Sequence, residues 1–154
     1  MSEQSRKKAV ERAVNVLSMR PYSRDGLYKR LVEKGVGAED AAYAVAHLCR
    51  LGLLDDGQYA RDLCRSGKNK GWGAGRIRQE LRRKGLDEEC IEAALADFEP
   101  DGEKLRRFVR SRLGGQTPDR AALRRVSDGL FRRGFSWDEI NEAINQCLEE
   151  MGDE

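Results

Sequence analysis

The sequence predicts an all-α protein made of three tandem three-helix repeats, about nine helices, which form an elongated, curved array. The first observation is an internal repeat: an apolar helical stripe ends three times in a Lys/Arg-Gly pair, at Gly35, Gly85 and Gly134. The second is that apolar residues recur at matching positions after each glycine. Stacked repeats of this kind build long surfaces, which suit long partners better than small substrates.

Each Lys/Arg-Gly pair is typical of a helix end. The glycine falls where a helix C-terminus needs a left-handed residue, which a side chain with a Cβ resists. A cation in the last turn before it meets the negative end of the helix dipole. Apolar residues after each glycine are spaced by four and three, which indicates one face of a further helix. They are Ala41, Val45 and Leu48; Ile91, Leu95 and Phe98; and Ile140, Ile144 and Cys147.

An earlier apolar stripe adds a third helix to each repeat. Val10 and Val14 lie 25 and 21 residues before the first glycine, as Val109 and Leu113 do before the third. Residues 67–75 contain four glycines and two lysines, so we expect a flexible connector and hinge there. We expect repeats over 1–52, 53–99 and 100–154, with helices over 6–19, 23–34, 39–51, 56–66, 75–84, 88–98, 102–113, 119–133 and 137–150.

Several helix starts carry capping signals. Ser136 and Glu139 match a capping box, in which each side chain bonds the other residue's amide. Thr117 before Pro118 predicts a cap followed by a proline at the first helical position. The sequence contains three prolines, and none falls inside a predicted helix.

Composition excludes several protein classes. Of the 154 residues, 36% are charged and 39% are hydrophobic, and no apolar run is long enough to span a bilayer. The first residues lack the apolar core of a signal peptide, so we expect a cytoplasmic protein that does not bind membranes. Each repeat is small enough to be marginal alone, which predicts contacts between neighbours.

The sequence offers no set of residues for catalysis or metal binding. The chain has one histidine, His47, and four scattered cysteines without a Cys-x-x-Cys pair, so we expect four reduced thiols. No nucleophile–base pair at a useful spacing is visible. We therefore expect no enzyme activity, no cofactor and no metal ion.

The net charge of +2 conceals strong segregation along the chain. Residues 61–84 contain nine basic and two acidic residues, and residues 104–133 contain ten and two. Residues 87–103 contain eight acids and no base. We predict that the basic blocks bind a partner or nucleic acid through Lys68, Lys70, Arg76, Arg78, Arg82, Arg83, Lys84, Arg106, Arg107, Arg110, Arg124 and Arg125.

A second interpretation treats these charges as solvated faces and internal ion pairs, which is the usual case for charged helices. Two details favour binding. Arginine outnumbers lysine, and guanidinium suits bidentate contact with phosphate or carboxylate. Arg78 and Arg82, like Arg106 and Arg110, are like charges four residues apart, an unfavourable spacing unless an anion compensates.

Three segments of the chain resemble the RecX regulatory proteins of bacteria. They run from Arg20 to Gly35 (RPYSRDGLYKRLVEKG), from Leu51 to Ala60 (LGLLDDGQYA) and from Gly71 to Gly85 (GWGAGRIRQELRRKG). The resemblance implies a monomeric regulator that binds the RecA–DNA filament. It also implies that the regulator mainly inhibits recombinase ATPase, strand-exchange and coprotease activity in DNA repair and the SOS response. Unlike the family pattern, glycines stand inside two predicted helices, at 26 and 129, and should soften repeats one and three.

Motif residues also have structural interpretations. Asp55 and Asp56 could form a metal-binding pair, but capping of the next helix is favoured. The glycines of 67–75 lack the Gly-Lys-Ser/Thr ending of a phosphate loop. Trp72 is expected to pack between repeats or, less favoured, to stack on a partner. We expect four aromatic residues in the core: Tyr59, Phe108, Phe131 and Phe135.

The alternative function is a DNA-binding module that acts without a recombinase and without sequence preference. A helix-glycine-helix segment within a three-helix bundle is compatible with helix-turn-helix geometry. The expected recognition helices begin with acids, however: Glu39 and Asp40, Glu88 and Glu89, and Asp138 and Glu139. Acids there repel phosphate, so we expect single- or double-stranded DNA to bind only weakly.

Overall fold

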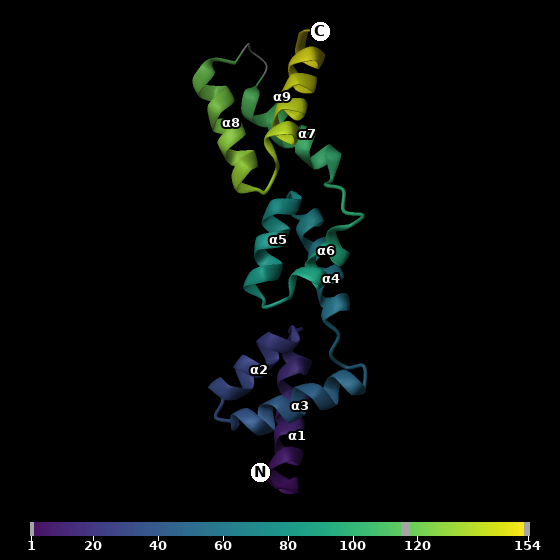
Figure 1. Cartoon of the computed structure of the whole chain (residues 1–154). Helices are drawn as coiled ribbons and strands as arrows, with labels where there is room; N and C mark the ends of the chain where they lie inside the picture. Colours follow the sequence, from purple (N-terminus) through teal and green to yellow (C-terminus); the bar gives the residue numbers. More distant parts are fainter. Residues whose placement is uncertain (1, 115–117, 153–154) are drawn as a thin grey trace. The chain divides into compact units, whose positions relative to one another are not determined.

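The computed structural model describes residues 2–114 and 118–152, which form nine α-helices and no strand (Figure 1). The predicted all-α class and helix order are confirmed. The helices are α1 (Glu3–Met19), α2 (Arg24–Glu33), α3 (Ala38–Arg50), α4 (Asp56–Asn69), α5 (Ala74–Arg83), α6 (Glu88–Leu95), α7 (Gly102–Leu113), α8 (Arg120–Arg132) and α9 (Trp137–Gly152).

The helices belong to two compact units. Unit 1 comprises Met1–Asp62 and Leu81–Ala94, and unit 2 comprises Leu63–Glu80 and Leu95–Glu154. Helices α4 and α5 each contribute residues to both units. The hydrophobic cores of the two units are described separately below.

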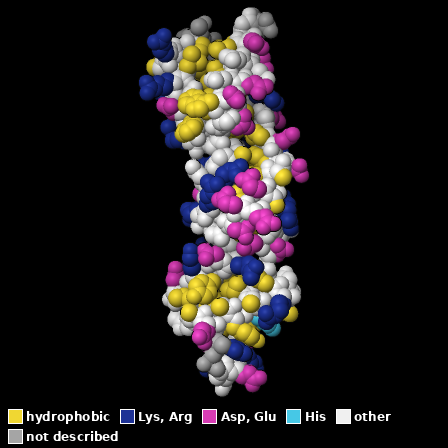
Figure 2. All heavy atoms as spheres, viewed as in Figure 1, with side chains coloured by type: hydrophobic (Ala, Val, Ile, Leu, Met, Phe, Trp, Pro, Cys, Tyr) yellow, Lys and Arg dark blue, Asp and Glu magenta, His cyan; other side chains and the backbone are white. Residues whose placement is uncertain are grey.

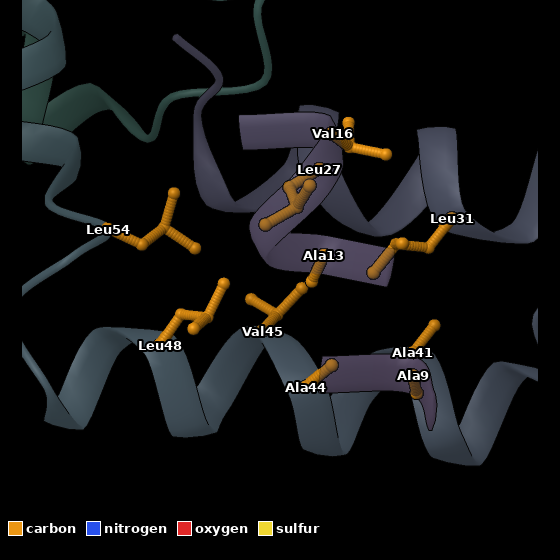
Figure 3. Close-up of a cluster of buried hydrophobic side chains, with 10 residues drawn as sticks. All are labelled: Ala9, Ala13, Val16, Leu27, Leu31, Ala41, Ala44, Val45, Leu48 and Leu54. Atoms are coloured by element: carbon orange, nitrogen blue, oxygen red, sulfur yellow. The ribbon is translucent and has the colours of Figure 1, made fainter. Parts of the chain in front are cut away.

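The core of unit 1 is formed by α1, α2 and α3 (Figure 3). Leu27, Leu31 and Leu48 are fully buried in it. Of the predicted stripe on α1, Val10 packs half-buried against this core, whereas Val14 is 43% exposed. The buried positions of α1 are Ala9, Ala13 and Val16. Because alanine is small, its positions on α1 allow close contact with α3, and the larger valine is left at the edge.

The core of unit 2 joins α7, α8 and α9. The predicted residues Val109, Leu113, Ile140, Ile144 and Cys147 are all buried in it, together with Val126, Leu130, Phe135 and Ala143. The prediction for Phe131 was wrong, because this residue is 57% exposed and stacks on exposed Trp137, with ring centroids 5.7 Å apart. The other predicted core aromatics, Tyr59 and Phe108, are half-buried.

The three repeated glycines end α2, α5 and α8 as predicted. Gly35, Gly85 and Gly134 have φ values of 93°, 85° and 97°, in the left-handed region. In each turn the residue after the glycine donates its amide to a carbonyl five residues earlier, for example Phe135 to Leu130 at 3.1 Å. This hydrogen bond satisfies a carbonyl that the end of the helix leaves without a partner.

The segment 67–75 is not the open connector that its composition suggested. Helix α4 continues through Asn69, and Gly67 is buried where an added Cβ would lie 2.7 Å from Ile77 Cγ1. Gly73 donates its amide to the Arg133 carbonyl at 2.8 Å, and Gly75 donates to the Gly134 carbonyl at 2.9 Å. These glycines therefore permit close backbone contact between the start of α5 and the end of α8 within unit 2.

A related junction occurs within unit 1. The Ser23 hydroxyl at the start of α2 donates to the Lys84 carbonyl at the end of α5, at 2.5 Å. In both units a helix N-terminus therefore meets a helix C-terminus, an arrangement in which the two ends have opposite partial charges. Asp56 supports the unit 1 junction, because its carboxylate accepts the Arg24 amide at 2.8 Å.

Most predicted caps are confirmed. Ser136 and Glu139 form the capping box, with N···O distances of 2.9 and 3.2 Å. Asp55 caps α4 by accepting the Gln58 amide. The cap of α8 is Asp119, which accepts the Ala122 amide, and Pro118 precedes the helix. The predicted cap, Thr117, lies outside the described residues.

Candidate basic binding surface

The twelve predicted binding residues are divided between the two units. Nine lie in unit 2, and Arg82, Arg83 and Lys84 lie in unit 1. All twelve side chains are exposed or half-buried, as binding residues must be. Over α5 and α6 the visible surface carries both signs of charge side by side (Figure 2).

Arg82, Arg107 and Arg110 form ion pairs with described acidic residues. Arg82 makes a bidentate contact with Glu88, at 2.6 and 3.1 Å. Arg107 pairs with Glu103 at 3.0 Å, and Arg110 pairs with Glu150 at 2.7 Å. The hydrogen bond and charge of Glu88 raise the pKa of Arg82 above its ordinary value. The sequence argument that Arg82 and Arg110 need an anion from a partner was therefore wrong. Glu88 compensates the charge of Arg82, and Glu150 compensates that of Arg110.

Three others remain more available to a partner. Arg106, Arg124 and Arg125 are exposed, and among residues 2–114 and 118–152 none of them forms an ion pair. Arg106 lies on α7, and the other two lie on α8. Because these three side chains have no ion pair with another described residue to break, they can contact a partner without losing such a pair.

Trp72 organises two of the predicted cations in unit 2. The Arg76 guanidinium lies 4.3 Å from the centre of the indole ring, and the Lys70 ammonium lies 5.0 Å from it. The ring itself is half-buried and packs on Gly67. The sequence favoured packing between repeats, but the contacts of Trp72 with Gly67, Lys70 and Arg76 all lie within the repeat 53–99. The ring also holds two cations through its π-face.

A pocket in unit 2 brings together five arginines from α5, α7, α8 and the turn after α8. Arg76 and Arg125 were predicted binding residues, whereas Arg112, Arg132 and Arg133 were not. The pocket has a volume of about 560 Å³. Phe108 is part of its wall, with the guanidinium carbons of Arg112 and Arg133 lying 4.7 and 4.4 Å from the ring centre. The spacing of Phe108 and Arg112, one helical turn apart, was a sequence signal that could have identified one of these residues.

The acids at the starts of α3, α6 and α9 lie in the first helical turn, as predicted. Helix N-termini attract anions, and a carboxylate at that position competes with phosphate. The second helix of each helix-glycine-helix segment therefore presents a surface that disfavours insertion into a DNA groove.

The histidine and the cysteines are the side chains outside this surface that could react or bind a metal ion. His47 is half-buried and stacks on Tyr43. The four cysteines are free, as expected, and burial raises the pKa of the Cys90 and Cys147 thiols. In the described part of the chain, no group of three His, Cys, Asp or Glu residues could hold a metal ion. None of the described helices is long and apolar enough to cross a membrane.

Comparison with known proteins relates all three helical repeats to one family. Residues 9–48, 55–95 and 99–144 match the first, second and third three-helix domains of RecX. The regulatory protein RecX of Stenotrophomonas maltophilia is 41% identical over 87% of this chain and 83% of its own length. That of Xanthomonas axonopodis is 39% identical over 92% of this chain and 88% of its own. The chain belongs to the RecX family.

Solved RecX structures have the same fold. The crystal structure of RecX from Lactobacillus salivarius matches 95% of this chain and 98% of its own, with a TM-score of 0.85 and 23% identity. A second RecX crystal structure matches 92% of this chain and 72% of its own, with a TM-score of 0.79 and 30% identity. The protein is thus a RecX family member with that family's three three-helix domains, and the family is one of regulatory proteins.

Proposed function

We propose that this RecX family protein binds the RecA–DNA filament and mainly inhibits the recombinase in DNA repair and the SOS response. The observation that carries the proposal is the match of all three helical domains to RecX, in the expected order. The inhibited activities would be ATP hydrolysis, strand exchange and coprotease function. The protein would act as a monomeric cytoplasmic ligand of the filament and would catalyse no reaction itself.

The charge distribution supports a protein–DNA filament as the partner. Arg106, Arg124 and Arg125 offer guanidinium groups to phosphates or to acidic recombinase side chains. The acids at the starts of α3, α6 and α9 argue against reading DNA sequence through a groove. A partner that combines phosphate with protein surface fits both the available arginines and the acidic helix starts. Naked DNA fits only the arginines.

The proposal is tested by measuring ATP hydrolysis by the cognate recombinase on single-stranded DNA while this protein is titrated in. We expect hydrolysis to fall with increasing concentration. The double variant Arg106→Gln/Arg124→Gln should need about tenfold more protein for the same inhibition, since each lost charge-assisted bond contributes about 1.5–3 kcal/mol, less where exposed.

Arg50→Gln/Arg120→Gln is the matched control, because it removes two exposed guanidinium groups outside the predicted binding set. Its inhibition curve should coincide with that of the parent protein. Unchanged hydrolysis at saturating concentrations of the parent protein would contradict the proposed function.

A DNA-binding module without a recombinase remains the second candidate. The pocket of unit 2 that is lined by five arginines is the observation that favours it, because clustered guanidinium groups also suit a phosphate backbone. The two functions predict different effects of recombinase. A filament ligand binds recombinase-coated DNA more tightly than bare DNA, whereas a DNA-binding module binds bare DNA at least equally well.

A further inference from the structure

We propose that the pocket lined by Arg76, Arg112, Arg125, Arg132 and Arg133, here called the arginine pocket, binds an anion with adjacent phosphoryl groups. The chemistry fits the polyphosphate of a free nucleotide or a stretch of nucleic-acid backbone. The inference does not depend on the proposed function, because binding is measured with this protein alone.

The first support is the concentration of charge. The arginine pocket contains five guanidinium groups and one carboxylate, Asp128, which gives a net charge of +4. None of these six side chains forms an ion pair with another described residue. Five like charges around one cavity repel each other, and a single carboxylate ligand would compensate few of them. An anion carrying several adjacent charges fits this field better.

The second support is that three of the guanidinium groups are held in place. Phe108 positions those of Arg112 and Arg133, and Trp72 positions that of Arg76. Phe108 reaches this position because residue 129 is glycine, where an added Cβ would lie 3.2 Å from Phe108 Cζ. The glycine at 129 thus has a packing reason that the sequence did not reveal. Side chains fixed in this way lose less conformational entropy on binding.

The third support is the size and lining of the cavity. A volume of about 560 Å³ falls within the range of about 300–1,000 Å³ that is typical of small-molecule sites. Ala122, Val126 and Gly129 supply apolar lining beside the arginines.

The proposal is tested by isothermal titration calorimetry with inorganic tripolyphosphate at near-physiological salt. We expect one saturable site per chain. The variant Arg112→Gln/Arg125→Gln should bind at least about tenfold more weakly, because it removes two charge-assisted contacts. The control Arg50→Gln/Arg120→Gln removes the same charge outside the arginine pocket and should bind within about twofold of the parent protein. Circular dichroism checks that both variants fold, and Arg125→Gln alone replaces the double variant if it does not.

Two further titrations identify the source of the phosphate. If the ligand is a free nucleotide, ATP binds with the same dependence on Arg112 and Arg125, and binding of an oligo-dT strand is unaffected by their substitution. If the ligand is a nucleic-acid backbone, oligo-dT binding falls in the same variant and tripolyphosphate competes with it. No saturable tripolyphosphate binding, or equal weakening in the pocket and control variants, would overturn the proposal.

Discussion

The glycine at the end of each repeat's second helix has different surroundings in the three repeats. At Gly35 an added Cβ would meet nothing within 4 Å. At Gly85 it would lie 2.7 Å from Asp25 Cβ, and at Gly134 it would lie 2.7 Å from Arg76 Cβ. All three positions require positive φ, but only the last two also require the absence of a side chain.

Alanine substitution should separate these two requirements. Gly35→Ala should lower the free energy of unfolding by about 1–2 kcal/mol, the cost of a left-handed alanine. Gly85→Ala and Gly134→Ala should cost about 1–3 kcal/mol more, because the added Cβ would displace the Asp25 side chain at Gly85 and the Arg76 backbone at Gly134. Urea unfolding followed by circular dichroism measures the difference. Equal costs at all three positions would show that close approach contributes nothing.

Some side-chain positions could be predicted from the sequence and others could not. The Lys/Arg-Gly pairs could be predicted because a helix end imposes local constraints on a few consecutive residues. The exposure of Phe131 could not be predicted, because its spacing from other apolar residues is that of a core residue. In the structure it lies at the surface and stacks on Trp137. The arginine pocket was missed because Arg112 and Arg132 lie on different helices and come together only when α7 packs on α8.

At the scale of elements, the start of α5 has an unexpected role. The glycines of 67–75 suggested mobility because composition alone does not distinguish a flexible glycine from one that permits close packing. Gly73 and Gly75 belong to the second kind, since their amides bond the carbonyls of Arg133 and Gly134. Only the tertiary structure supplies those acceptors, which lie about 60 residues further along the chain.

Amide hydrogen exchange tests this role of the α4–α5 segment. The amides of Gly73 and Gly75 should exchange as slowly as those in the middle of α8, because both are bonded within unit 2. Gly134→Ala should accelerate both, since it displaces the acceptor carbonyls. Fast exchange at both positions in the parent protein would restore the hinge that the composition suggested.

For the whole molecule, the repeat pattern predicted the fold class, and motif segments predicted the RecX family, which the three domain matches confirm. Periodicity carries this information because matching apolar stripes recur on the helices of each repeat. The division into two compact units could not be predicted, since α4 and α5 have residues in both. The pairing of Arg110 was equally hidden, because Arg110 meets Glu150 only through tertiary contact.

The central claim is that the recombinase–DNA filament, and not DNA alone, is the partner of this protein. Fluorescence anisotropy of labelled single-stranded DNA tests it most directly, with and without cognate recombinase and a non-hydrolysed nucleotide. To follow this protein in both arms, a second label is placed on its amino terminus. We predict at least about tenfold tighter binding to the filament, because acids at the starts of α3, α6 and α9 oppose DNA phosphates. Equal affinity in the two conditions would contradict the account and favour a DNA-binding module.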